Sequence, residues 1–383
     1  MDDVPERGFP VCEFETRLQR AQSLMATKGL DGILLMSEAE VRYFTGFLTQ
    51  FWQSPTRPWF LFVPVDKKPI AIIPEIGAAL MSNTWIEDIR TWSAPAPKDD
   101  GISLLLDLLG PLSERGARLG IMKGHETILR MPLGDYERLM SGLPGMELVD
   151  ATEILRSLRM VKSDAEIEKI AHICNIASRT FERANEVFYK GQPLEEAFRA
   201  FRMECLAQGA DDVPYLAGNA DQGGYRDIIS PPSQRPLKSG DILMLDTGAT
   251  FDGYFCDFDR NFGIEQADDL SHRAYDILWR ATEAGMNAAR PGVTCRELFQ
   301  AMQNVISEID DHGGEVGRYG HGLGMQLTEW PSHADFDETV LEKNMVITLE
   351  PSLNYGDGLI MVHEENIVVQ NGAPRLLSMR AAP

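Results

Sequence analysis

Segment 241–262, DILMLDTGATFDGYFCDFDRNF, limits what this 383-residue chain can fold into. Two stretches rich in apolar residues flank an Asp-Gly dipeptide at 252–253, which is typical of a tight hairpin turn. Asp246 and Asp257 lie at nearly equal distances from this turn, so we expect them to face each other across an antiparallel hairpin. Two carboxylates so close together repel each other. The segment therefore predicts either a cation between the aspartates or a surface hairpin that carries them by chance.

Three residues elsewhere in the chain can complete a metal site. Glu350 ends an apolar stretch, MVITLE, and Glu364 lies inside LIMVHEENIVV, where an unpaired charge would be costly. His321 lies in GHGLG, whose glycines allow the backbone to approach a crowded site closely. With the two aspartates, these residues provide four carboxylates, whose charge balances two divalent cations, and one imidazole. Such ligation suits Mn, Fe or Co, and Zn less well. Two adjacent ions can polarise a substrate oxygen and activate a water molecule.

The order of predicted helices and strands divides the chain into two domains, residues 1–157 and 158–383. In the first, helical and strand patterns alternate, which is typical of an α/β domain. In the second, helices accompany mostly antiparallel strands, an α+β arrangement. Two capping boxes, SDAE at 163–166 and TCRE at 294–297, predict helix starts in the second domain. Further predicted helices are 14–28, 102–109, 193–208 and 269–289, and the predicted strands are 32–36, 59–63, 69–74, 119–122, 241–248, 254–262, 346–350 and 359–369.

The acidic composition restricts the partners. The net charge of -22 and the pI of about 4.7 argue against nucleic acid or an anionic membrane, because both attract a basic face. No apolar stretch approaches the roughly 18 residues of a membrane span, and the first residues lack a signal-peptide pattern. The 5 cysteines are dispersed without a CxxC spacing, which favours reduced thiols. We therefore expect a cytoplasmic protein whose partner is a small molecule or a dipeptide.

The segments that carry the candidate ligands resemble those of the M24 metallopeptidases, the pita-bread family of methionine aminopeptidase, prolidase, aminopeptidase P and creatinase. RPLKSGDILMLDTGATFDGYFCDFDRNF is similar to the family segment with two metal-binding aspartates, and GHGLG is similar to its histidine loop. NMVITLEPSLNY and HEENIVV resemble its two glutamate segments, and LRMVKSDAEIEKI resembles the start of its catalytic domain. The resemblance covers nearly the whole chain. It implies an α+β pita-bread catalytic domain preceded by an α/β domain of the creatinase/prolidase type.

The resemblance also implies a metal-ligand set and an assembly. Two divalent ions would be bound by five residues, of which Asp257 and Glu364 would bridge the ions: Asp246, Asp257, His321, Glu350 and Glu364. Creatinase-like proteins are dimers in which the N-terminal domain of one subunit faces the active site of the other. The resemblance therefore implies a homodimer.

Two short stretches provide candidate substrate-binding residues. TGFLTQFWQSPTRPWFLFVP is dense in aromatic and polar residues, and in a creatinase-like dimer its Trp52 and Arg57 would reach the substrate. The alternative is an edge strand with ordinary core aromatics. Tyr225 and Arg226, in the loop GGYRD, are candidates for lining the pocket.

The chain departs from the family pattern at two histidines that steady the substrate carbonyl and the tetrahedral intermediate in family peptidases. Their positions correspond to about Ile229 and to Thr328. A threonine can donate one hydrogen bond, but it cannot carry a positive charge or shuttle a proton near pH 7. Losing a positioned donor to an oxyanion typically costs on the order of 10²–10³ in rate. The departure therefore brings cleavage of proline peptides by the usual route into question.

Asp259 is a further departure, because the family usually has a threonine two residues after the bridging aspartate. Strand alternation places Asp259 on the same face as Asp257. It is therefore a candidate replacement for the general base, and pairing with Arg260 or Arg226 is the alternative. The candidate catalytic residues are Asp259, Glu329 and Thr328.

These expectations lead to one function and two alternatives. We expect a dinuclear-metal hydrolase of the M24 type that cleaves an amide or other C–N bond in a small, Xaa-Pro-like substrate. The first alternative is a lyase that acts on a betaine-like substrate, since TEWP resembles the pita-bread dimethylsulfoniopropionate lyases, which lack the same two histidines. In that branch, however, an aspartate thought to be the base occupies the position of Thr328. The second alternative is a catalytically silent binding protein with the same fold.

Overall fold

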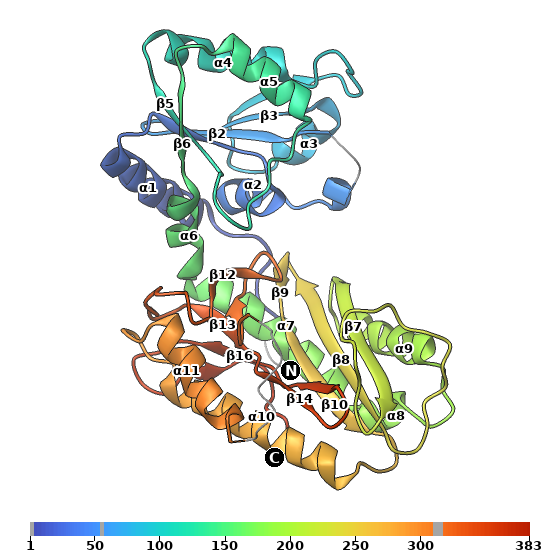
Figure 1. Cartoon of the computed structure of the whole chain (residues 1–383). Coiled ribbons are helices and arrows are strands. Elements are labelled where there is room, and N and C mark those ends of the chain that lie inside the picture. Colours follow the sequence, from blue (N-terminus) through green and yellow to red (C-terminus); the bar gives the residue numbers. More distant parts are fainter. Residues whose placement is uncertain (1–3, 54–56, 309–316) are drawn as a thin grey trace. The chain divides into compact units, whose positions relative to one another are not determined.

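The computed structural model describes residues 4–53, 57–308 and 317–383 (Figure 1). The described residues form two compact units, one from Glu6 to Arg159 and one from Met160 to Pro383 that also includes Val4 and Pro5. Within the described part of the chain, no helix combines the length and the apolar character needed to cross a bilayer.

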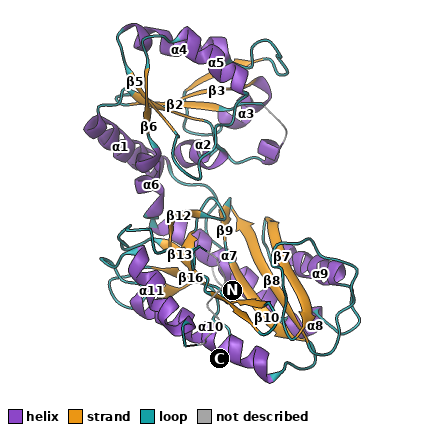
Figure 2. Cartoon of the chain, viewed as in Figure 1, coloured by secondary structure: helices purple, strands orange, loops and turns teal. Residues whose placement is uncertain are grey.

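The N-terminal unit is built around a mixed β-sheet, which has six strands among the described residues in the order β4-β3-β2-β1-β5-β6. Its central strand β1 pairs antiparallel with β2 and parallel with β5. Helices α4 and α5 cover one face of the sheet (Figure 2). There Leu105, Leu109 and Leu139 belong to one buried cluster with Leu34 and Phe62 of the sheet. The α/β prediction for this domain is confirmed, although β4, β6 and several helices were not predicted. The elements are α1 (Val11–Lys28), β1 (Gly32–Leu35), α2 (Glu38–Thr45), η1 (Gln50–Gln53), β2 (Phe60–Pro64), β3 (Ile70–Pro74), η2 (Glu75–Gly77), α3 (Ala78–Met81), β4 (Asp88–Trp92), α4 (Ile102–Glu114), β5 (Arg118–Ile121), α5 (Leu133–Gly142), β6 (Glu147–Asp150) and α6 (Thr152–Met160).

The second unit contains antiparallel sheets that are covered by helices on their outer sides (Figure 2). Every strand pairing described in it is antiparallel, which confirms the α+β prediction. The strands are β7 (Asp212–Gln222), β8 (Asp241–Phe251), β9 (Tyr254–Phe255), β10 (Phe258–Gly263), β11 (His321–Gly322), β12 (Glu329–Ser332), β13 (Val346–Leu349), β14 (Ser352–Tyr355), β15 (Leu359–Val362), β16 (Glu365–Val368) and β17 (Arg375–Leu376). The helices are α7 (Asp164–Glu182), α8 (Ala184–Val187), α9 (Leu194–Ala207), α10 (Asp269–Ala288) and α11 (Cys295–Ile306).

Local sequence signals explain where these helices begin and which faces they bury. Ser163 and Thr294 each accept a hydrogen bond from the backbone of a glutamate three residues later, and that glutamate bonds back, so both predicted capping boxes are confirmed. Helices α10 and α11 bury small and aliphatic side chains, such as Leu278 and Leu298, against Ile347 of β13. Because this packing fixes β13 and its neighbours, it also fixes the residues at their ends.

The register of the β8–β10 hairpin differs from the predicted one. The turn residues Asp252 and Gly253 have φ of 48° and 75°, the pair of positive values that a tight two-residue hairpin turn requires. This turn places Asp259 directly opposite Asp246. The expectation that Asp246 and Asp257 face each other is therefore wrong, because Asp257 lies two residues nearer the turn, between β9 and β10.

The predicted strand 359–369 is also interrupted. Its first part, β15, pairs with β14, and its second part, β16, pairs with β13 and β17 in another sheet. His363 and Glu364 connect the two parts. Glu364 thus lies at a point where the chain passes from one sheet to the next, and not inside a continuous strand.

Candidate metal centre

The five candidate ligands lie on or beside five different strands of the second unit. Asp246 belongs to β8, His321 begins β11, and the other three residues lie next to strand ends: Asp257 before β10, Glu350 after β13 and Glu364 before β16. Asp257, His321 and Glu364 are at most 4% exposed, and Asp246 and Glu350 are half-buried. Side chains that are separated by more than a hundred residues therefore enter one buried region.

The closest contacts form around the histidine. Nε2 of His321 lies 3.4 Å from Oδ2 of Asp257 and 3.9 Å from Oε2 of Glu350. Asp257, His321 and Glu364 each place one ligand atom within 4.8 Å of the others. Nδ1 of His321 lies 2.9 Å from the carbonyl oxygen of Gly322, so this nitrogen carries the proton and donates it. The Nε2 lone pair then faces the carboxylates, as in a histidine oriented for metal binding.

Buried oxygen atoms without partners support the assignment of a cation site. Oδ1 of Asp246 and Oε1 of Glu364 have no hydrogen-bond partner among the described residues. A buried polar atom normally has such a partner, and a buried charge is normally paired or bound to a metal. The oxygen-rich donor set with one oriented imidazole therefore fits divalent metal ions.

The shifted pKa values of the candidate ligands also support a cation site. Burial, and then the neighbouring carboxylate of Asp246, raise the pKa of Glu350 to about 8 and the pKa of Asp257 well above its ordinary range. Burial also raises the pKa of Asp246 to about 6, and burial with the Arg318 guanidinium lowers the pKa of His321 to about 4. The site without metal thus combines a neutral imidazole with carboxyl groups that resist ionisation. When a cation displaces the protons of these carboxyl groups, the same residues form a complete ligand set.

These shifts predict how the stability of the metal-free protein depends on pH. A carboxyl group whose pKa is higher in the folded than in the unfolded chain destabilises the fold as pH rises above the unfolded value, and its full effect is reached above the folded value. We expect the melting temperature of the metal-free protein to fall between about pH 6.5 and pH 8, where Glu350, with a pKa of about 8, loses its proton. Below about pH 6.5, the lowered pKa of His321 has the opposite effect and offsets that of the carboxyl groups. Differential scanning calorimetry can measure this slope, and saturating Mn²⁺ should remove it. A metal-free melting temperature that rises over this interval would contradict the account.

Asp259 adjoins this region. Its side chain is 1% exposed, and Oδ2 accepts a hydrogen bond from Nδ2 of Asn261 at 3.0 Å. The guanidinium of Arg260 bonds instead to Oε2 of Glu365 and to the carbonyl of Glu364, both at 2.9 Å. The side chain of Arg226 bonds to the carbonyl of Asp357. The alternative interpretation had expected one of these arginines to pair with the Asp259 carboxylate. Among the described contacts, neither does.

The other two candidate catalytic residues follow His321: Thr328 lies in the turn before β12, and Glu329 is the first residue of that strand. Oε2 of Glu329 lies 3.1 Å from Nζ of Lys162, with both side chains 2% exposed, and Oε1 accepts from the Gln326 amide at 3.1 Å. These contacts stabilise the turn that includes Thr328, whose side chain is half-buried. A catalytic role for Glu329 or Thr328 stays a prediction. Ile229, at about the position of the other missing family histidine, is 78% exposed.

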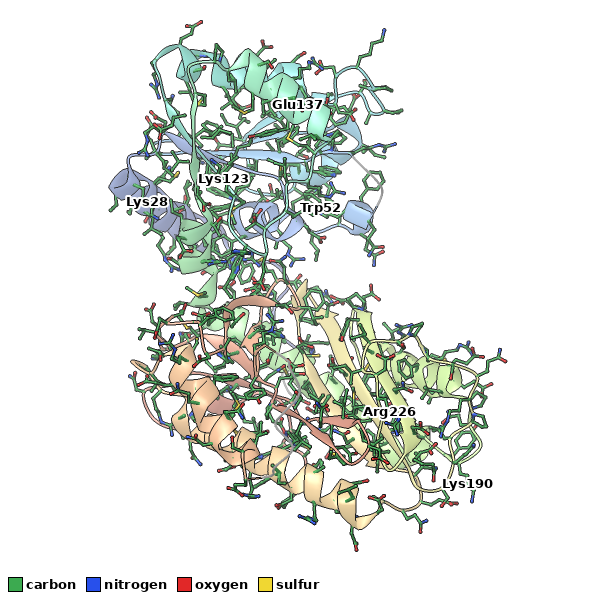
Figure 3. All side chains as sticks on the ribbon, in the orientation of Figure 1. Lys28, Trp52, Lys123, Glu137, Lys190 and Arg226 are labelled. Carbon is green, nitrogen blue, oxygen red and sulfur yellow. The ribbon has the colours of Figure 1, made fainter. Side chains whose placement is uncertain are left out.

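The candidate substrate-binding residues have mixed surroundings. Trp52 is 6% exposed, and its ring centroid lies 5.7 Å from that of Trp59 within the N-terminal unit. The guanidinium of Arg57, in the same unit, lies 5.5 Å from the ring centroid of Phe51. Figure 3 labels Trp52 in this unit and Arg226 in the other. The packing of Trp52 is that of a core aromatic, and its contact with a substrate stays a prediction.

Tyr225 and Arg226 are neighbours with different surroundings. Tyr225 is fully buried, and its hydroxyl donates to Oδ1 of Asn261 at 3.0 Å and accepts from the Val362 amide at 2.9 Å. Its role in lining a substrate pocket stays a prediction. Arg226 is exposed. The sequence interpretation did not identify Asn261, although strand alternation places it on the same face as Asp257 and Asp259.

The chain matches two family descriptions. Residues 168–371 match "Metallopeptidase family M24", and residues 17–161 match "Creatinase/Prolidase N-terminal domain". The Xaa-Pro dipeptidase of Pyrococcus furiosus is 25% identical over 94% of this chain and 97% of its own. The probable dipeptidase PepE of Mycobacterium tuberculosis is 26% identical over 97% of this chain and 98% of its own.

Solved structures agree with this relationship. The crystal structure of dipeptidase PepE from Mycobacterium ulcerans superposes with a TM-score of 0.84 at 25% identity, and it covers 98% of each chain. The recombinant prolidase from Thermococcus sibiricus has a TM-score of 0.84 at 21% identity and covers 96% of this chain and 97% of its own. The chain therefore belongs to metallopeptidase family M24, with a creatinase-type N-terminal domain before a pita-bread catalytic domain, and is a metallohydrolase.

Proposed function

We propose that this protein is a dipeptidase that uses two divalent metal ions, of Mn, Fe, Co or Zn, to hydrolyse the amide bond of small Xaa-Pro dipeptides. The observation that carries the proposal is the convergence of four carboxylates and one oriented imidazole from distant parts of the chain. The names of the similar proteins, Xaa-Pro dipeptidase and PepE, support a dipeptide substrate. A homodimer and a cytoplasmic location remain part of this proposal.

The ligands would be Asp246, Asp257, His321, Glu350 and Glu364, with Asp257 and Glu364 shared between the ions. Divalent ions bound there would polarise the scissile carbonyl and lower the pKa of a water molecule. The protein itself holds the ligands in place. The Gly322 carbonyl orients the His321 ring at 2.9 Å, and Asn366 bonds to both backbone groups of Asp257, its Oδ1 accepting from the amide at 3.0 Å. Such outer contacts fix ligand orientation before the metal arrives.

Three residues beside the ligands are candidates for handling the substrate and its proton. Thr328 occupies the position where family peptidases have a histidine, and its hydroxyl can donate one hydrogen bond to substrate. Glu329 follows it and is held by Lys162 at 3.1 Å. Asp259 lies opposite Asp246 and is 1% exposed. We infer that proton transfer is weaker here than in a site with two histidines, so turnover should be slow.

The test is turnover of a panel of Xaa-Pro dipeptides by the full-length protein, before and after reconstitution with Mn²⁺ or Co²⁺. We expect free proline to appear only with the reconstituted protein, and little product from matched Xaa-Ala dipeptides. A metal-loaded protein that releases no proline would overturn the dipeptidase assignment. If that protein instead released dimethyl sulfide from dimethylsulfoniopropionate, the lyase alternative would replace it.

A further inference from the structure

Asp259 lies opposite a candidate metal ligand. In the β8–β10 pairing it is the direct partner of Asp246, and directly opposite side chains in an antiparallel pair have Cβ atoms about 4.5–5.5 Å apart on the same face. Like charges directly opposite are destabilising unless something compensates them. The pair therefore requires a compensating group.

The carboxylate of Asp259 has one bonded oxygen and one open oxygen. Oδ2 accepts from Nδ2 of Asn261 at 3.0 Å, whereas Oδ1 has no hydrogen-bond partner among the described residues, although the side chain is 1% exposed. The same condition holds for Oδ1 of Asp246 and Oε1 of Glu364. Three neighbouring carboxylates thus each have a buried oxygen without a hydrogen-bond partner among the described residues.

A closed set of hydrogen bonds orients Asp259. Nδ2 of Asn261 donates also to the carbonyl of Val362 at 2.7 Å, and Oδ1 of Asn261 accepts from the Tyr225 hydroxyl at 3.0 Å. The amide of Val362 completes the set by donating to that hydroxyl at 2.9 Å. These bonds fix the amide of Asn261 with its donor toward Asp259. Outer contacts of this kind orient carboxylates that bind metal.

Among the described residues, no lysine or arginine side chain forms an ion pair with this carboxylate, and Arg260 pairs with Glu365 instead. The neighbouring guanidinium of Arg260 bonds to Glu365 and to backbone carbonyls, including those of Asp259 and Glu364. The open Oδ1 oxygen of Asp259 is therefore available to a bound cation.

We propose that Asp259 is a sixth protein ligand of the metal centre and binds, through Oδ1, the ion that Asp246 binds. The proposal rests on the metal-dependent function proposed above. A fifth carboxylate adds a hard oxygen ligand to the site, and such ligands favour Mn²⁺ over Zn²⁺, which prefers few ligands in a tetrahedral arrangement. Asp259 then holds metal and is not a free general base.

The test is a titration of the metal-free, full-length protein with Mn²⁺ by isothermal titration calorimetry. Asp259→Asn keeps the size of the side chain and its hydrogen-bonding capacity but removes the charge. We expect this variant to bind one of the two ions at least about tenfold more weakly, because even outer-shell changes typically cost 10–100-fold in affinity. Its metal-free melting temperature should not fall, since the change removes repulsion with Asp246.

Asp252→Asn is the matched control, because Asp252 is a buried carboxylate of the same hairpin that pairs with Lys169 at 2.7 Å. This control should bind Mn²⁺ as the wild type does but melt at a lower temperature. Wild-type affinity in Asp259→Asn would overturn the sixth-ligand proposal alone, and so would a loss of affinity accompanied by a lower metal-free melting temperature. Failure of the wild type to bind Mn²⁺ would overturn the metal-dependent function as well.

Discussion

Asp246→Ala should lower the turnover of Xaa-Pro dipeptides by more than about 10³-fold. Even the loss of an outer-shell partner typically costs 10–100-fold, and this change removes a ligand directly. Asp246 lies in the middle of β8, between β7 and β10, so its position is fixed by pairing on both sides. Steady-state kinetics at saturating Mn²⁺, with a metal count on the same sample, measures the effect.

Asp221→Ala is the matched control for this experiment. Asp221 lies on the neighbouring strand β7, and its exposed side chain pairs with Arg235 at 3.1 Å, away from the ligand set. The control should retain wild-type turnover and metal content. Full activity in Asp246→Ala would show that the metal assignment is wrong.

Glu329→Gln should lower the free energy of unfolding by about 3–5 kcal/mol, because it leaves a buried ammonium without its partner. Lys162 and Glu329 are each 2% exposed and lie 3.1 Å apart. Urea denaturation of the metal-free protein measures the loss. The exposed pair Lys68–Glu87 provides the control, since Glu87→Gln should change stability by less than about 1 kcal/mol.

A double variant separates the structural role of Glu329 from a catalytic one. Replacing a buried ion pair by apolar residues of similar volume is often close to neutral, so Lys162→Met with Glu329→Leu should recover most of the lost stability. We expect the recovered protein to keep measurable turnover, because the observed contacts of Glu329 stabilise the turn after His321. A stable double variant without any turnover would assign Glu329 to proton transfer. If Glu329→Gln lowered the free energy of unfolding by less than about 1 kcal/mol, the pair of Lys162 and Glu329 would behave as an exposed pair, which would contradict its burial.

The sequence predicted the architecture where local signals are strong. The serine and threonine of the two capping boxes, Ser163 and Thr294, mark helix starts that the structure confirms, because the bonds involved are local. The alternation of helices and strands likewise indicated the α/β and α+β units. Strands β4 and β7 were not predicted, since DIRTW and DVPYLAGNADQ contain polar residues or a proline that weaken the strand pattern.

The details of the site depended on contacts that the sequence does not reveal. The expectation that Asp257 faces Asp246 treated their distances from the turn as equal, whereas the two-residue turn at Asp252 and Gly253 places Asp259 opposite Asp246. The pairing of Lys162 with Glu329 joins residues 167 positions apart, so no local pattern indicates it. For the same reason, the sequence did not indicate the hydrogen bonds of Tyr225 with Asn261 and Val362.

The central claim, that the acids and His321 converge because they bind metal, is tested most directly by elemental analysis. Purified protein would be reconstituted with Mn²⁺, dialysed extensively and analysed beside Asp257→Ala, which lacks the carboxylate closest to the His321 ring. The account predicts close to two ions per chain in the wild type and a strongly reduced count in the variant. A wild type without bound metal, or a variant that retains both ions, would contradict it.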